Sequence, residues 1–179
     1  MNDPLSQFSA ACKAVLSENT GPDGRAQVRQ LLEALLQNPD FIDRYCGAQA
    51  APGLHVLYED PELKFQILAH INEKARVSPP HDHGASWAIY GQAVGYTDMT
   101  EFARVDGPAP NQVQLTVERS YRLSPGQAGI YADGAIHSID YPEKSKFIRV
   151  TGTNLDNIAR NMFDLKTGTV RQMTPQQAS

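Results

Sequence analysis

The apolar residues near the start of the chain recur at the spacing of α-helices, which predicts two helices before residue 38. Side chains three and four positions apart form one apolar face on each: Leu5, Phe8, Cys12, Val15 and Leu16 on the first, and Val28, Leu31, Leu32, Leu35 and Leu36 on the second. Asp3 followed by Pro4 is typical of a helix start, because aspartate caps free N–H groups and proline fits the first helical position. The segment 19–24 contains glycine and proline and separates the two helices.

A short third helix is predicted over residues 41–46, and 48–53 is a linker. After it, short apolar runs alternate with Gly, Pro, Asn and Asp, which predicts a series of strands. We expect these strands at residues 54–58, 64–71, 86–94, 95–102, 113–123, 128–131, 135–140 and 146–151, with a final hairpin over 163–173. Helices followed by strands predict a mainly β fold, a sandwich or barrel over 54–179, with the helices of 1–47 packed on it as one domain overall.

The composition of the chain excludes some classes of binding partner. The chain has 179 residues, 41% of them apolar and 20% charged, which suits one ordinary globular domain. The net charge is −4 and no run of Lys or Arg is dense, so nucleic acid is not expected as a partner. No apolar stretch reaches the length of a membrane span, and Met1–Pro4 lacks the basic start of a signal peptide. Cys12 and Cys46 are interpreted as free thiols, so we expect a cytoplasmic protein.

Two histidines one residue apart are the first candidates for chemistry. Successive side chains of a strand alternate between its faces, so His81 and His83 point the same way and Asp82 points the opposite way. Two imidazoles on one concave face can share a metal ion, and neutral imidazole suits iron, zinc, copper and nickel. Such a pair is short and common, so two hydrogen-bonded histidines without a metal remain the alternative.

A third ligand is expected from a later strand. Residues 124–137 form a turn, a short strand and a second turn that lead to an isolated His137. In a closed sheet this strand can lie beside the His81 strand, and then the three imidazoles converge. Without the rest of the pattern, His137 is equally well interpreted as a polar residue whose ring forms hydrogen bonds. His55 and His70 show no partner pattern and receive no role.

Together these segments resemble the cupin superfamily, whose first motif has His-x-His followed by Glu and Gly. Residues 80–84 through Gly95 match that motif without its Glu, and Gly129 through His137 matches the second motif. The resemblance covers about residues 54–154 and implies a double-stranded β-helix barrel. It also implies one divalent transition metal, held by His81, His83 and His137.

The missing Glu directs the resemblance to one branch of the superfamily. The usual position falls near Trp87 or Ala88, where no carboxylate stands. A site of three histidines without Glu is similar to that of the thiol dioxygenases, cysteine dioxygenase and mercaptopropionate dioxygenase, which also carry helices before the barrel. This implies iron(II), dioxygen and a small thiol or carboxylate-bearing substrate. Alternatives are a metal- or ligand-binding cupin without turnover, and an isomerase that uses zinc, manganese or nickel.

The substrate residues of that branch are less well matched. Its Ser-x-His-x-Tyr triad aligns with residues 147–151, where Arg149 takes the His position, and its anchoring Arg is missing around Glu59. We therefore expect weak turnover of free cysteine. The Cys that forms a thioether with a Tyr in cysteine dioxygenase also has no counterpart here, because Ala88 or its neighbours occupy its place, so we expect no such crosslink. Arg149 is the candidate to bind a substrate carboxylate, and Trp87, on the His81 face by alternation, the candidate to wall the pocket. No catalytic residue is assigned, and a homodimer is left open.

Overall fold

The computed structural model describes residues 3–109 and 111–175; Met1, Asn2 and the last four residues of the expected barrel segment lie outside it. Three helices come first, α1 (Pro4–Glu18), α2 (Pro22–Leu35) and α3 (Pro39–Cys46). Asp3 caps α1, since its carboxylate accepts a hydrogen bond from the Ser6 backbone N–H at 3.2 Å. None of the helices in the described ranges has the length and apolar character that a membrane crossing requires.

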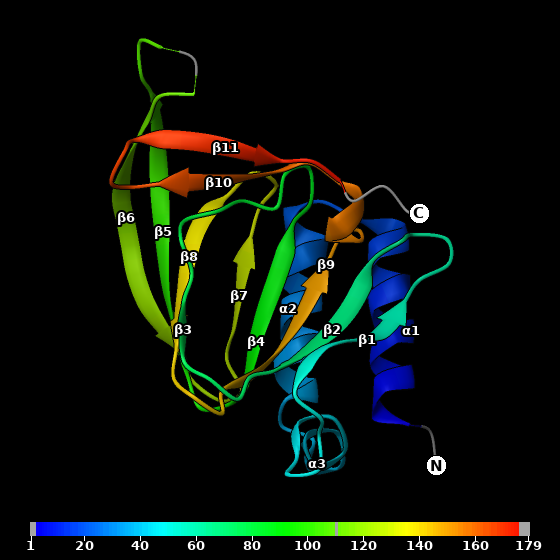
Figure 1. Cartoon of the computed structure of the whole chain (residues 1–179). Coiled ribbons are helices and arrows are strands. Elements are labelled where there is room, and N and C mark those ends of the chain that lie inside the picture. The colour runs from blue at the N-terminus through cyan, green and yellow to red at the C-terminus, as the bar shows by residue number, and fades with distance from the viewer. Residues whose placement is uncertain (1–2, 110, 176–179) are drawn as a thin grey trace.

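Two antiparallel sheets make up the main body (Figure 1). The five-stranded sheet has the order β1 (Gly53–Glu59), β2 (Gln66–Ile71), β9 (Lys146–Thr151), β4 (Ala88–Val94), β7 (Ala128–Tyr131). The four-stranded sheet has the order β3 (Arg76–Val77), β8 (Ile136–Tyr141), β5 (Thr97–Asp106), β6 (Val113–Leu123). The mainly β fold with helices at its start, expected from the sequence and from the cupin resemblance, is confirmed. The two-residue strand β3 was not expected.

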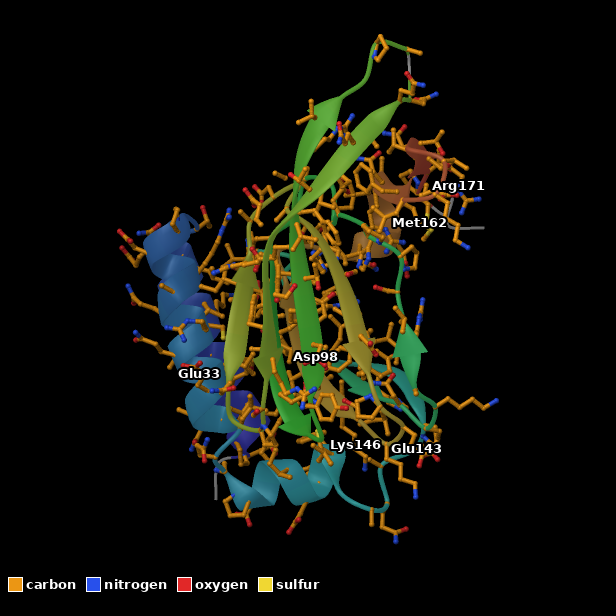
Figure 2. The ribbon with its side chains drawn as sticks, turned by 90° about the vertical axis from the view of Figure 1, so that its left-hand side faces the viewer. Glu33, Asp98, Glu143, Lys146, Met162 and Arg171 are labelled. Carbon is orange, nitrogen blue, oxygen red and sulfur yellow. The ribbon has the colours of Figure 1, made fainter. Side chains whose placement is uncertain are left out.

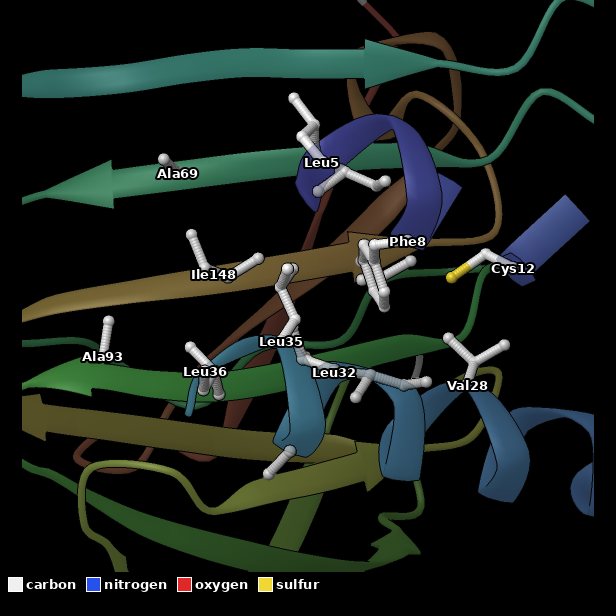
Figure 3. Close-up of a cluster of buried hydrophobic side chains, with 14 of the residues drawn as sticks. Leu5, Phe8, Cys12, Val28, Leu32, Leu35, Leu36, Ala69, Ala93 and Ile148 are labelled. Atoms are coloured by element: carbon white, nitrogen blue, oxygen red, sulfur yellow. The ribbon is translucent and has the colours of Figure 1, made fainter. Parts of the chain in front are cut away.

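The strands β2, β9 and β4 of the five-stranded sheet are mostly buried on both faces, whereas the edge strand β1 is largely exposed. The outer face of this sheet carries Ile67, Ile89, Ile148 and Val150, which form one apolar cluster with the helices. Figure 3 shows this cluster, with Leu32 and Leu36 of α2 packed against the strand that carries Ile148. Side chains of the alternate positions, among them Ala88, Tyr90 and Phe147, form a second cluster inside the barrel.

Gly91 on β4 lets α2 approach the sheet closely. A Cβ atom at Gly91 would lie 2.7 Å from methyl groups of Leu32 and Leu36, which is shorter than real side-chain contacts. Because the helices cover this face, they pack on the outside of the barrel and leave its interior to other residues. Cys12 and Cys46 lie within this outer cluster as free thiols, and burial raises their pKa values to about 12 and about 11.

A hairpin of β10 (Arg160–Asp164) and β11 (Thr169–Met173) follows a single 3-10 turn, η1 (Leu155–Asn157). In Figure 1 it runs across one end of the barrel strands. Figure 2 places Met162 and Arg171 of this hairpin on the side of the barrel opposite the helices. The hairpin therefore borders the barrel interior at the end where the His81 segment lies, since Met162 forms a β-bridge with His81.

Candidate metal centre

Three histidines from distant parts of the chain meet inside the barrel. One possible ligand nitrogen from each of His81, His83 and His137 lies within 4.8 Å of the other two. The ring centroids are 4.6 Å apart for His81 and His137, 4.8 Å for His83 and His137, and 5.5 Å for His81 and His83. The convergence predicted from the two motifs is therefore present.

Backbone pairing, rather than a regular strand, places His81 next to His137. The His81 N–H donates to the His137 carbonyl at 2.9 Å, and the His137 N–H donates back at 3.0 Å. Residues 82–87 are not in a strand, contrary to our expectation. Gly84 explains this, because it adopts φ +58° and its Cα lies against the backbone of Ala159, where a Cβ would clash.

The remaining ring nitrogens fit a metal. His81 Nδ1 lies 3.0 Å from the Pro79 carbonyl oxygen and His137 Nδ1 lies 3.3 Å from that of Ala135, so each Nδ1–H donates and Nε2 carries the lone pair. His137 Nε2 is buried and has no hydrogen-bond partner among the described residues. His83 Nε2 lies 3.2 Å from the Tyr90 hydroxyl.

Burial keeps these imidazoles neutral, which is the form that binds metals. Desolvation is the largest cause for all three, lowering the pKa of His137 to about 3 and that of His83 well below its ordinary value. The pKa of His81 is also lowered, with the nearby Arg149 adding to the effect. Three neutral nitrogen donors without a carboxylate suit first-row divalent metals. The residues present therefore fit the metal site implied by the resemblance, and the identity of the metal stays open.

Asp82 fixes the loop that carries two of the histidines. It is buried, and because this segment is not a regular strand, the hydrogen bonds of its carboxylate set its orientation. Its carboxylate accepts hydrogen bonds from the backbone N–H and the side-chain amide of Asn161, both at 2.8 Å, and from the Gly84 N–H at 2.9 Å. Asn161 belongs to β10, so Asp82 joins the His81–His83 segment to the C-terminal hairpin.

A series of hydrogen-bonded side chains begins at the ring of Tyr131, which packs against His137. The Tyr131 ring lies 4.5 Å from the His137 ring, and its hydroxyl lies 2.6 Å from that of Tyr121. Tyr121 donates to Glu101 at 2.8 Å, and Arg119 donates to the same carboxylate oxygen at 2.8 Å. Burial raises the pKa of Tyr121 to about 12 and raises that of Tyr131. Both phenols are therefore neutral hydrogen-bonding groups at neutral pH.

A cavity of about 400 Å³ opens beside His81. Its walls include apolar side chains of Leu68, Ile139 and Phe147, and its polar groups include Tyr90 and Arg149. This volume is within the range of small-molecule sites. A larger groove of about 910 Å³ lies along the hairpin, but none of the three histidines lines it, so it is not the site of the metal chemistry.

Arg149, the candidate for binding a substrate carboxylate, lines this cavity. It sits on β9 opposite Leu68 of β2 and Tyr90 of β4, in the middle of the sheet. Its Cζ lies 5.9 Å from the centre of the Tyr90 ring, and its Nε is buried without a hydrogen-bond partner. The described part of the chain offers it no ion-pair partner. A half-buried cation of this kind is suited to bind an anionic group of a ligand.

Trp87 does not wall the pocket, which corrects our expectation. It packs in the outer apolar cluster, its indole lies close to Gly152, and the guanidinium of Arg25 lies 5.8 Å from its ring centre. The alternation that we extended from His83 is interrupted by the turn at Gly84, so Trp87 faces the helices. Among the tyrosines of the barrel, Tyr90 lines the cavity, whereas Tyr131 does not.

His70 and Arg160 are among the cavity residues that the sequence reasoning missed. His70 is on β2, two positions from Leu68, so strand alternation from a known pocket residue would have found it. Its ring stacks on Phe147 with centroids 4.4 Å apart. Arg160 opens β10 and reaches the cavity only through the packing of the hairpin, for which the sequence carries no local signal.

Several of the solved structures similar to this chain are described as cupin domains or cupin proteins. No family model and no curated protein matches. The cupin domain of Cnp3 from Schizosaccharomyces pombe is 13% identical with a TM-score of 0.43, over 56% of this chain and 60% of that chain, which is less than two thirds of its length. KdgF from Halomonas sp. is 16% identical with a TM-score of 0.42, over 55% and 74%. A cupin superfamily protein from Desulfitobacterium hafniense is 14% identical with a TM-score of 0.43, over 59% and 84%. Values this low carry no argument about ligand or activity.

Proposed function

We propose that this chain is a metal-dependent cupin that works as a non-haem iron dioxygenase on a small anionic substrate, a thiol or a carboxylate. The observation that carries the proposal is the meeting of three neutral imidazoles, without a carboxylate, beside a cavity that contains the unpaired Arg149. Three neutral ligands leave the full charge of a divalent ion uncompensated, which favours an anionic ligand. Iron(II) would supply open coordination positions for the substrate and dioxygen.

The residues of the cavity have separate tasks in this proposal. Arg149 binds the substrate carboxylate and so fixes the distance of the reacting group from the histidines. The Tyr90 hydroxyl, 3.2 Å from His83 Nε2, is close enough to donate a hydrogen bond to a ligand at the metal centre. Leu68, Ile139 and Phe147 form apolar walls that limit the access of water.

The cavity also indicates which thiols to test. Arg76, Arg149 and Arg160 line it, and Asp156 is the one acidic residue among the lining residues. This excess of positive charge repels an ammonium group, so free cysteine is a poor substrate compared with a thiol acid that lacks the amine. 3-Mercaptopropionate differs from cysteine by that amine alone and is the matched probe.

The test combines metal analysis with oxygen uptake. The purified chain is loaded with iron(II), zinc or manganese in turn and mixed with 3-mercaptopropionate, cysteine or a panel of small carboxylates. Oxygen uptake that requires iron, and sulfinate formation from the thiol acid, support the proposal. Metal binding without uptake for any compound would instead favour a binding protein, and conversion of a substrate by the zinc or manganese form without oxygen would favour an isomerase.

A further inference from the structure

Three of the four buried side-chain nitrogens that have no hydrogen-bond partner in the described ranges belong to residues of one cavity. They are His70 Nε2, Arg149 Nε and Arg160 Nε, and the fourth is His137 Nε2 of the metal centre. Buried polar groups in folded proteins almost always have a partner, so each exception calls for an explanation. Gathered in one cavity, these three point to a ligand that supplies acceptors.

The cavity has more positive charge than its own acidic group offsets. Arg160 lies 3.6 Å from Asp156, but the Asp156 side chain is 65% exposed, so solvent screens this pair. Arg149 has no acidic partner, and the exposed Arg76 adds a third cation to the lining. Cations held in a partly buried cavity are costly unless an anion joins them.

The two inner cations come from different elements. Arg149 is fixed in the middle of the five-stranded sheet by its neighbours on β2 and β4, whereas Arg160 enters from the hairpin strand β10. Both line the cavity beside His81. A ligand in the cavity can therefore meet a cationic group from each of two elements.

His70 completes this part of the cavity as a neutral group. Burial, with Arg149 and Arg76 as further causes, lowers its pKa well below the ordinary value, so its ring carries no charge at neutral pH. Its unpartnered Nε2 can form one hydrogen bond to a polar atom of the ligand.

We infer that the cavity selects small dicarboxylates, with one carboxylate bound by Arg149, the other by Arg160, and a hydrogen bond from His70 to one of them. The metal-binding group, a thiol or hydroxyl, lies between the two carboxylates. This inference rests on the proposed function for the reaction, but the pair of arginines binds a dianion whatever the chemistry at the metal.

The test compares dicarboxylates with their monoamides, which have the same shape and one charge less. Isothermal titration of the full chain, loaded with redox-inactive zinc, uses malonate, succinate, glutarate and the three monoamides. A hydrogen bond to a charged group corresponds to roughly a tenfold to hundredfold change in Kd. We expect at least one of the three diacids to bind roughly tenfold or more tightly than its monoamide.

Two variants test whether Arg160 binds the second carboxylate. Arg160→Gln should remove most of the preference for the diacid while keeping zinc content and thermal stability. Arg171→Gln is the matched control, since Arg171 is exposed on the other strand of the same hairpin and does not line the cavity. It should leave the preference unchanged.

The outcomes separate this inference from the proposed function. If no diacid is preferred over its monoamide, or if Arg160→Gln keeps the preference, the inference is wrong even when the iron form consumes oxygen with 3-mercaptopropionate. If the preference exists and depends on Arg160 while no compound supports oxygen uptake, the inference stands and the dioxygenase proposal fails.

Discussion

The hydroxyl of Tyr131 lies 2.6 Å from the hydroxyl of Tyr121, and the ring of Tyr131 lies 4.5 Å from the ring of His137. Tyr131 is buried and Tyr121 is half-buried. The Tyr121 hydroxyl donates a hydrogen bond to the Glu101 carboxylate. The exposed Arg119 donates a second one to the same carboxylate. The position of one candidate ligand therefore depends on a hydrogen-bonded series that begins at the exterior of the four-stranded sheet.

Replacing Tyr121 with Phe should destabilise the protein. The substitution leaves the buried Tyr131 hydroxyl without its partner, which costs about 1–3 kcal/mol in the free energy of unfolding. Urea unfolding measures this change, and Tyr45→Phe on α3 is the control. A Tyr121→Phe protein with the stability of the unmodified chain would show that the phenol pair does not support His137.

Replacing any one of the three site histidines with Ala should lower the metal content. The unmodified chain should hold one metal ion per chain, with metal–nitrogen distances of about 2.0–2.2 Å for imidazole ligands. Elemental analysis after dialysis measures the content. His55→Ala serves as the control, because His55 lies on β1 and bonds only the Ala51 carbonyl, at 2.7 Å. A variant that keeps full occupancy removes its histidine from the ligand set.

Replacing Arg149 with Gln should weaken substrate use by the loss of one charged contact. The expected loss is about 1.5–3 kcal/mol in kcat/KM, with most of it in KM if the contact is equally strong in the ground and transition states. Steady-state oxygen uptake measures it. Metal content should stay unchanged, which distinguishes a substrate contact from damage to the metal centre. An unaltered kcat/KM would mean that the carboxylate binds elsewhere.

Stability of the metal-free protein should fall as the solution becomes acidic. Burial lowers the pKa values of His70, His83 and His137, to about 3 for His137, whereas an unfolded histidine titrates near about 6.5. The unfolded chain therefore binds more protons below that pH. Each of these residues then costs up to about 1.4 kcal/mol of stability per pH unit as pH falls from about 6.5. Urea unfolding of the chelator-treated chain between about pH 7.5 and about 4.5 gives the slope.

Two variants show how much of this pH dependence comes from His70. His70→Gln removes a buried imidazole outside the metal centre, so unfolding should take up as much as one proton fewer, and the slope of stability against pH should decrease accordingly. His55→Gln should keep the slope of the unmodified chain, because His55 is partly exposed. Identical slopes for all three proteins would show that His70 does not stay neutral in the folded state.

The order of elements could be predicted because helical spacing, the Asp3 cap and strand alternation act within a few residues. The convergence of the three histidines was predicted only through the resemblance of two motifs to the cupins, since local rules do not give the long-range pairing of His81 with His137. The orientation of Trp87 could not be predicted, because the turn at Gly84 breaks the alternation, and Gly84 is required there by a backbone contact to Ala159. Arg160 depends entirely on how the hairpin packs.

The hydrogen bonds between Asp82 and Asn161 let the lining of the cavity change without loss of the joint between the hairpin and the histidine loop. One of them joins two backbone groups, the Asp82 N–H and the Asn161 carbonyl, and in the other two the Asp82 carboxylate accepts from the Asn161 N–H and side-chain amide. Arg160 takes no part in these bonds. A substitution at Arg160 would therefore alter the charge of the cavity and leave this joint in place.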